Sequence, residues 1–416
     1  MIDGARVNIH LSTRVFHDAD NNDMSHDYHI PITLLDYLGS CIYGDPKSYY
    51  IGLNEDKRAE LEVQGKNFGM TAWLYRYLCD VLPETKRTEY QKIYYARQVK
   101  ALMSAKELNR LYSILSVHNL RFVPIKGADL AYRLYPDAAL RTFNDWDIWF
   151  HPDDCEHALS VLTGDGWEVE YSSKDHEAIY VKGTHHFSAF IRGQHIIEPH
   201  FTLANFEDIA PYKMWEYTMD HPANNGARIL SPEMNLLMLT RHAATKSYYH
   251  AQIPKLLTDA AMVMKEKVDF DKLRKMSTYW GLPYPGDFLA AFPEFFPATV
   301  IERFDANPER AEAFRKIFEL RGELGEQDFV SLSLGRYEVR SNVFCGLLKR
   351  FRALNQSAIR SIYHLPKHSA WWRVVWAYMC WFCSRSRRAL TWIQRKPVFQ
   401  DYVYLVDRVE SGGTYK

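Results

Sequence analysis

The amino-acid sequence predicts an α+β fold, with a small mixed β-sheet flanked by N-terminal and C-terminal helical subdomains. Two observations lead to this prediction. Short apolar runs bounded by glycine and proline occur between residues 119 and 222, where strands are expected. Longer stretches on both sides repeat their apolar residues at helical intervals. With 416 residues and 47% hydrophobic content, the chain is long enough for two or three domains with sizeable cores.

The N-terminal part is predicted to form a polar arm followed by a helical subdomain. Residues 1–30 are rich in Asp, Asn and His and show little periodicity, so we expect a flexible arm. Residues 31–118 contain helical patterns such as "TAWLYRYLCDVL" and form the predicted helical subdomain. The first residues lack the basic and apolar segments of a secretory signal, so a cytoplasmic location is expected.

Residues 119–222 are predicted to form the α/β core. The run "FVPI" is a short strand, Lys126 and Gly127 lie at its end, and "ADLAYRLY" makes two helical turns. The next strand is "DWDIWF", and "HPDDCEHALSVLTGDG" carries the proline, acids and glycines of a helix start and end. Glycines separate "EAIYVKG", "HHFSAFIRG" and "QHIIEPHFTL", which predict antiparallel hairpins.

Two further segments follow the core. Residues 223–282 are predicted to be a helical subdomain that completes the active-site cleft, starting at "SPEMNLLMLTRHAATKS" and continuing through "IPKLLTDAAMVMKEK". Residues 283–416 are predicted to be a helical, cationic and tryptophan-rich extension. Between positions 339 and 400 there are twelve Lys or Arg and no Asp or Glu, which leaves 39 basic and 51 acidic residues elsewhere. Such a cationic segment favours phosphates, of lipid headgroups or of nucleic acid.

Two aspartates in the second predicted strand are the first sign of chemistry. Asp145 and Asp147 are two residues apart, so they share one face of a strand, where aspartate is otherwise depleted. Two carboxylates so close repel each other unless a cation lies between them. Mg²⁺ prefers such oxygens and usually keeps part of its shell for phosphates. The alternative is a solvated strand end.

Three neighbouring features support a phosphate-directed site. Glu198, in the strand-like "HIIEPHF", could meet the pair across the sheet, and three carboxylates can hold two Mg²⁺ roughly 4 Å apart. Lys126 and Gly127, where a strand feeds a helix, could bring backbone N–H groups to phosphate oxygens. Arg141 could pair with a triphosphate. The alternatives are a surface charge for Glu198, a simple turn for Gly127 and an ion pair for Arg141.

Other positions are weaker candidates. His242 and Lys246 are four apart on one predicted helix face and could reach a nucleotide, although His242 could equally be a core histidine. Asp259 ranks below them. His200 could support the acidic cluster or cap its strand, and the pair at 185–186 has no partners at metal-ligand spacing.

The series "VPIKGADLAYRLYPDAALRTFNDWDIWFHPDD", "IIEPHF", "LLMLTRHAATKS" and "LLTDAAMVM" resembles a bacterial nucleotidyltransferase family of largely unassigned substrate. That family belongs to the DNA polymerase β-like superfamily, and the resemblance covers about residues 70–275. It implies that Asp145 and Asp147 bind the metals and the NTP phosphates and that Glu198 is the third carboxylate, a common general base for the acceptor hydroxyl.

The resemblance also implies that Lys126, Gly127 and Arg141 bind phosphate. The sequence departs from the superfamily at the phosphate-binding loop. Ala128 stands where a second glycine or a serine is usual, and 18 positions, rather than about ten, separate Gly127 from Asp145.

The sequence therefore predicts an enzyme that uses two Mg²⁺ ions, with Mn²⁺ as a substitute, to transfer NMP from an NTP to a hydroxyl acceptor. A sugar, a lipid-linked intermediate, a peptide, a protein or a tRNA end could be that acceptor. One alternative is a metal-dependent glycosyltransferase, because Asp-x-Asp also grips nucleotide sugars through Mn²⁺. Another is a catalytically degenerate, membrane-associated binding or scaffold protein.

The C-terminal segment leaves three possibilities open. Five of the eleven tryptophans fall between 371 and 392, but the apolar run 370–383 is only fourteen residues long and includes Arg373. A transmembrane helix needs about twenty such residues, so none is predicted. Residues 340–396 could lie on an anionic membrane, which would place the protein at the inner membrane face, or could pack on the acidic body. Binding of nucleic acid is less favoured.

Overall fold

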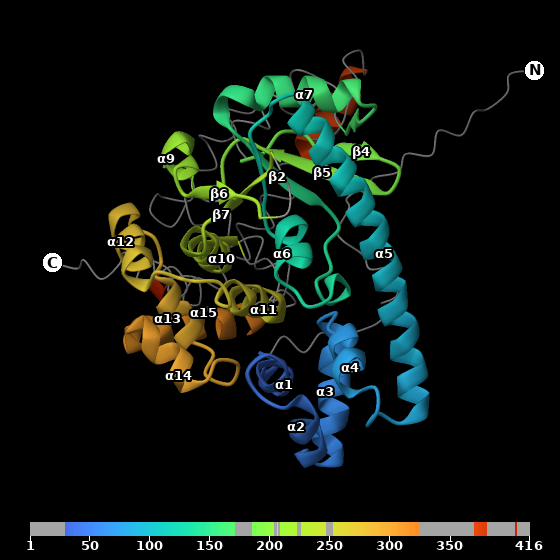
Figure 1. Ribbon diagram of the computed structural model, residues 1–416, viewed down its shortest axis with the longest axis vertical. Helices are drawn as coiled ribbons and strands as arrows, with labels where there is room; N and C mark the ends of the chain where they lie inside the picture. The colour runs from blue at the N-terminus through green and yellow to red at the C-terminus, as the bar shows by residue number, and fades with distance from the viewer. Residues whose placement is uncertain are drawn as a thin grey trace, which may run out of the picture.

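The computed structural model confirms the α+β class, with one small mixed sheet and helices on both sides of it in sequence (Figure 1). The residues described are 30–170, 185–203, 206, 209–222, 226–246, 253–323, 370–380 and 404–405, without the side chains of 244–246 and 321–323. The predicted arm (apart from residue 30), the predicted strand "EAIYVKG" and most of the cationic segment lie outside these residues.

Five helices confirm the helical prediction for the N-terminal part. Asp45 caps the second with a following proline, and Asn54 caps the third, so local sequence sets where they begin. The last of the five is the longest and runs along one side of the molecule (Figure 1). The five are α1 (Ile32–Tyr43), α2 (Pro46–Gly52), α3 (Glu55–Asn67), α4 (Thr71–Leu78) and α5 (Glu84–Val117).

In the described part of the chain, the main sheet has five strands in the order β1-β2-β5-β4-β3. β1 and β2 are antiparallel, β2 and β5 are parallel, and β5, β4 and β3 continue as antiparallel neighbours. Gly193, with φ of 59°, allows the tight turn between β4 and β5, which confirms the hairpin prediction there. The strands are β1 (Phe122–Pro124), β2 (Trp146–Phe150), β3 (Glu168–Val169), β4 (Phe190–Arg192) and β5 (His195–His200).

The two faces of β2 pack against different cores. Trp146, Ile148 and Phe150 lie in a core shared with α5 and with α7 (Cys155–Gly164), as the strand alternation predicted. Trp149 points to the opposite face, into the larger core that also holds the C-terminal helices. Asp147 shares that face with Trp149, which directs its carboxylate toward those helices.

The remaining helices lie between the strands of the main sheet or follow them in the sequence. A two-stranded sheet of β6 (Thr218–Asp220) and β7 (Arg228–Leu230) leads into them. The short helices α6 and α11 lie beside each other below the sheet in Figure 1. The elements are α6 (Gly127–Arg133), η1 (Ala138–Leu140), η2 (Pro152–Asp154), α9 (Pro211–Trp215), α10 (Pro232–Lys246), α11 (Ile253–Val263), α12 (Phe270–Trp280), α13 (Pro285–Ala290), α14 (Ala298–Ile301), η4 (Glu302–Phe304) and α15 (Pro308–Glu323).

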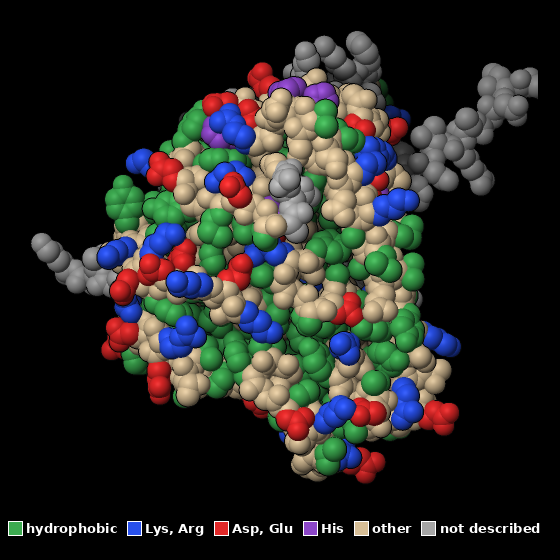
Figure 2. Space-filling model, viewed as in Figure 1, with side chains coloured by type: hydrophobic (Ala, Val, Ile, Leu, Met, Phe, Trp, Pro, Cys, Tyr) green, Lys and Arg blue, Asp and Glu red, His purple; other side chains and the backbone are tan. Residues whose placement is uncertain are grey.

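The N-terminal and C-terminal helices share one hydrophobic core. Leu34 and Leu38 of α1 are in the same cluster as Leu257 of α11 and Phe292, and α1 contacts α11 directly. The predicted boundaries between the helical subdomains and the α/β core remain predictions. Acidic and basic side chains intermingle on the face shown in Figure 2.

The described part of the C-terminal segment includes one helix over residues 371–380. Among the described residues, no helix combines the length and the apolar character needed to cross a membrane.

Candidate active site

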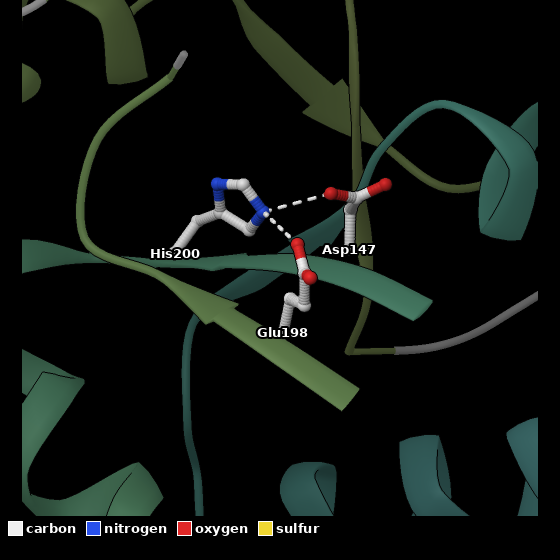
Figure 3. A group of neighbouring side chains, drawn as sticks. All are labelled: Asp147, Glu198 and His200. Carbon is white, nitrogen blue, oxygen red and sulfur yellow. Dashed lines mark hydrogen bonds and ion pairs between the residues drawn. The ribbon is translucent and has the colours of Figure 1, made fainter. Parts of the chain in front are cut away.

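Parallel pairing of β2 and β5 brings two carboxylates together at neighbouring positions of the sheet. Asp147 lies opposite Glu198 in the register, and their side chains point to the same face (Figure 3). The sequence predicted this meeting across the sheet. Two acids this close on buried strands are costly without a positive charge beside them.

His200 joins these two carboxylates. Its Nε2 lies 2.8 Å from Asp147 Oδ1 and 4.0 Å from Glu198 Oε2 (Figure 3). The ligand atoms of the three side chains all lie within 4.8 Å of one another, which makes them the candidate metal-binding group among the described residues. We call Asp147, Glu198 and His200 the acidic cluster.

Asp145 takes a different place from the one expected. It precedes the first residue of β2, in a bend, and it is outside the group of ligand atoms within 4.8 Å. Its charge still acts on the cluster, because it contributes to the raised pKa of Glu198. The predicted role of Asp145 as a metal ligand remains a prediction.

Lys126 supplies the counter-charge in this structure. The antiparallel pairing of β1 and β2 extends to a hydrogen bond from Ile125 N–H to the carbonyl of Asp147, which places Lys126 beside the cluster. Its Nζ lies 2.8 Å from Asp147 Oδ1. The backbone of Lys126 has φ of 53°, which is rare for a residue with a side chain and is often found at functional sites.

Gly127 begins α6 directly after this residue. A Cβ atom at Gly127 would lie 2.6 Å from Cβ of Phe143, so the chain packs too closely here for any side chain. Close packing against Phe143 therefore explains why position 127 is a glycine, independently of any role in phosphate binding. It also ties the strand-to-helix junction to the loop that leads into Asp145.

Burial and the charges of neighbouring groups shift the pKa values of the three acids. Burial first, and then the charges of Asp147 and Asp145, raise the pKa of Glu198 to about 8. Burial and the charge of Asp147 likewise raise the pKa of Asp145. Burial opposes ionisation of Asp147 as well, but the charge of Lys126 and the hydrogen bond with His200 hold its pKa well below the usual range. Asp147 is therefore favoured in its ionised form, whereas burial and the neighbouring charges favour the protonated form of Glu198.

Two more histidines line the cluster. The rings of His185 and His186 lie 5.1 and 5.2 Å from that of His200, and His186 Nε2 is 4.0 Å from Glu198 Oε2. Burial, followed by the charge of His200, lowers the pKa of His186 to about 4. The sequence showed no partners for the pair at metal-ligand spacing, and neither residue is in the metal-binding group; the bridge between His186 and His200 nevertheless brings both rings beside the cluster. Spacing along the chain could not show this.

The model of a family described as "Uncharacterised nucleotidyltransferase" matches residues 74–285, just over half of the chain. The chain belongs to this family of nucleotidyltransferases. Comparisons with curated proteins and with solved structures gave no significant match. The matched region includes the acidic cluster and Lys126, and it ends well before the helix at 371–380.

Arg141 makes the ion pair that was the alternative to phosphate binding. Its Nε and Nη2 lie 2.7 and 2.8 Å from the two carboxylate oxygens of Asp259 in α11. Tyr135 donates a further hydrogen bond to the same carboxylate. Both charged groups are buried, at 8% and 1% exposure of their side chains. Nη1 of Arg141 donates a hydrogen bond of 2.6 Å to the carbonyl of Thr142. Arg141 is therefore held in a structural pair, and its contact with a triphosphate stays a prediction.

Lys255 is a charged residue near the site that the sequence did not predict. It lies in α11, one turn before Asp259, and its pKa is lowered to about 8 by burial, followed by the charge of Arg141. Asp145 and Arg97 are also among the charges that act on it. A lysine in the mostly apolar helix sequence "IPKLLTDAAMV" was the available signal.

Arg97 and Arg141 also line a small cavity of about 40 Å³ next to Phe143. We call Arg97, Arg141 and Lys255 the cationic wall. The other two residues that the sequence predicted to contact a nucleotide, His242 and Lys246, lie in α10. His242 is half-buried, and Lys246 is the last residue of the helix, with its side chain outside the described set.

Proposed function

We propose that this protein is a divalent-metal-dependent nucleotidyltransferase of the DNA polymerase β-like kind, which transfers NMP from an NTP to a hydroxyl acceptor. The observation that carries the proposal is the register of two parallel strands, which sets Asp147 beside Glu198 within the region matched by the family. Hard carboxylate oxygens at this spacing suit Mg²⁺, two ions being the number that the resemblance implies, with Mn²⁺ as a substitute.

The reaction needs one bond made and one broken at the α-phosphorus. The acceptor oxygen attacks phosphorus, the bond to the bridging oxygen of the β-phosphate breaks, and pyrophosphate leaves. Bound divalent metal would neutralise charge on the phosphates and orient them for in-line displacement. Asp147, Glu198 and Asp145 would hold it. Once ionised, Glu198 is also placed to accept the proton of the attacking hydroxyl.

The phosphates would lie between the acidic cluster and the cationic wall. Lys126 would move from Asp147 to a phosphate oxygen when metal takes over its counter-charge. Gly127 would contact phosphate through its backbone N–H, since Phe143 fills the space beside its Cα. Arg141 and Lys255 would face the triphosphate from the opposite side. His242 and Lys246 would contact the nucleotide from α10.

The test incubates the protein with each α-labelled NTP, Mg²⁺ or Mn²⁺ and an extract of the source organism. We expect label to move to an acceptor and pyrophosphate to be released. Asp147→Asn should abolish both, whereas Asp220→Asn, at a side chain 92% exposed, should change neither. Absence of transfer and of pyrophosphate release with every NTP would refute the proposal.

The geometry disfavours the two alternatives. A nucleotide-sugar glycosyltransferase would be favoured by a Rossmann-like sheet of six or more strands, and over the described residues the main sheet has five strands of mixed direction. A degenerate scaffold would be favoured by carboxylates that point apart, and those of Asp147 and Glu198 converge on His200 (Figure 3).

An anionic membrane surface is the partner that we propose for the cationic segment. The helix at 371–380 packs inward through small residues, Val374 and Ala377, which are 4% and 3% exposed. Its large apolar side chains point outward and form what we call the tryptophan face: Trp371 at 75% exposure, Trp372 at 56%, Trp376 at 68% and Met379 at 54%. Tryptophan beside Arg-rich sequence suits the headgroup region of a bilayer. The protein would then act in the cytoplasm at the inner membrane face.

Sedimentation with vesicles tests this contact. We expect binding to vesicles of phosphatidylcholine with phosphatidylglycerol, weakened by salt, and little binding to phosphatidylcholine alone. Trp371→Ser with Trp376→Ser should reduce it, whereas Tyr279→Ser, at a residue 73% exposed in α12, should not. Binding to RNA or DNA in place of anionic vesicles would contradict the proposal.

A further inference from the structure

We propose that His200 is a direct ligand of the catalytic cation, and that the site consequently binds Mn²⁺ more tightly than Mg²⁺. The inference rests on the proposed function for the role of the ion, but it concerns the binding of the ion alone. The metal site that the resemblance implies consists of carboxylates, so an imidazole ligand changes both the donor set and the expected metal.

The positions of the donor atoms favour one shared ion. Donors that bind one ion at about 2.1 Å lie roughly 3 to 4 Å from each other. His200 Nε2 is 2.8 Å from Asp147 Oδ1 and 4.0 Å from Glu198 Oε2. An ion could therefore enter between these atoms with small side-chain adjustments. The nitrogen that faces this space is the one that both dashed lines join in Figure 3.

His200 is also held more firmly than an incidental neighbour would be. Its side chain is 0% exposed, it ends β5 opposite Trp149 of β2, and the rings of His185 and His186 cover it. A buried ligand whose strand pairs with that of Asp147 costs little to orient when an ion binds. Asp145, in contrast, lies before β2 and outside the close group of ligand atoms.

Lys126 explains how the cluster is kept neutralised without an ion. Its Nζ lies 2.8 Å from Asp147 Oδ1, the same oxygen that His200 approaches. An entering dication would displace both the ammonium and the hydrogen bond. The neutral ring of His200 would then carry its single proton on Nδ1, which leaves Nε2 free to bind the ion.

The donor types decide the metal preference. Carboxylate oxygen suits Mg²⁺ and Mn²⁺ alike, whereas imidazole nitrogen favours transition metals over Mg²⁺. Two carboxylates with one imidazole therefore select Mn²⁺ over Mg²⁺, and we expect a difference in dissociation constant of at least about tenfold. The catalytic steps of the proposed function are the same with either metal.

The test uses the full-length protein with metal and no nucleotide. Electron paramagnetic resonance measures how much Mn²⁺ is bound and how much Mg²⁺ displaces it, and pulsed measurements detect nitrogen-14 coordinated to Mn²⁺. We expect one bound Mn²⁺ with a coordinated imidazole nitrogen. His200→Asp should remove the nitrogen coupling and reduce the preference for Mn²⁺ over Mg²⁺ by about tenfold. The control is His186→Gln, at a residue whose Nε2 lies 4.0 Å from Glu198 Oε2. This variant should retain both the nitrogen coupling and the preference for Mn²⁺.

Several results would overturn the inference. Bound Mn²⁺ without nitrogen coupling in the wild type would show a ligand set of oxygens alone, and this result needs no variant to fold. Loss of the coupling in His186→Gln with retention in His200→Asp would assign the nitrogen to the other ring. Equal affinity for Mg²⁺ and Mn²⁺, or no Mn²⁺ binding, would also refute it. Because no NTP is present, these outcomes are separate from a failure to transfer nucleotides.

Discussion

Lys255→Met should stabilise the free protein and weaken its binding of triphosphate. The pKa of Lys255 is lowered from 10.5 to about 8, chiefly by burial, so holding its charge in the fold costs about 3 kcal/mol at neutral pH. Methionine keeps most of the apolar stem and has no charge. Since the side chain retains part of its exposure, we expect a gain of about 1–3 kcal/mol in the free energy of unfolding.

The pH dependence of this gain has a defined sign. The unfolded chain binds the lysine proton more tightly than the folded protein does, so the destabilisation of the wild type is fully present below pH 8. It decreases as the pH rises from 8 to 10.5, where both states lose the proton. The difference in stability between variant and wild type should therefore shrink over this interval, as measured by urea unfolding.

Binding of triphosphate should change in the opposite direction. If the ammonium of Lys255 faces the phosphates, its loss removes a charge-assisted contact of about 1.5–3 kcal/mol and weakens binding roughly 10- to 100-fold. Isothermal titration with inorganic triphosphate and with NTPs measures this change. Lys255→Arg should recover part of the affinity, and Lys265→Met, at an exposed position after α11, should alter neither stability nor binding.

Two outcomes would refute the reasoning on Lys255. A Lys255→Met variant less stable than the wild type would show that the lysine contributes net stability to the fold. Unchanged affinity for triphosphate would show that its ammonium does not face the phosphates. A gain in stability together with a loss of binding is what a charge buried for function predicts.

Two further predictions concern the packing and charges around the site. Gly127→Ala should lower the free energy of unfolding by about 1–3 kcal/mol and reduce transfer activity, because the added Cβ meets that of Phe143 at 2.6 Å. Gly164→Ala, with nothing within 4 Å of the added atom, is its matched control; equal unfolding midpoints in urea would contradict the packing explanation. Asp259→Asn should cost about 3–5 kcal/mol by leaving the buried guanidinium of Arg141 uncompensated. A cost below 1 kcal/mol in the same urea measurement would show that solvent or another group neutralises Arg141.

Local patterns were sufficient for most elements of the fold. Apolar runs bounded by glycine or proline located β1, β2, β4 and β5, and a proline in the first turn located the start of α10. The alternation in "DWDIWF" also predicted which residues of β2 face a core. These features depend on neighbours within a few positions of each other, which a single sequence displays.

The sequence by itself determined the acids and the residues beside them, together with the family that they indicate. Asp147, Glu198 and Lys126 were recognised because each lies at a strand or a strand end whose periodicity is local. The tertiary structure decided the rest. Parallel pairing of β2 and β5 brought His200 within 2.8 Å of Asp147, and the docking of α11 joined Arg141 to a carboxylate 118 residues away. Lys255 acquired its lowered pKa in the same way, since its burial and the positive charge of Arg141 beside it arise only when distant segments pack together.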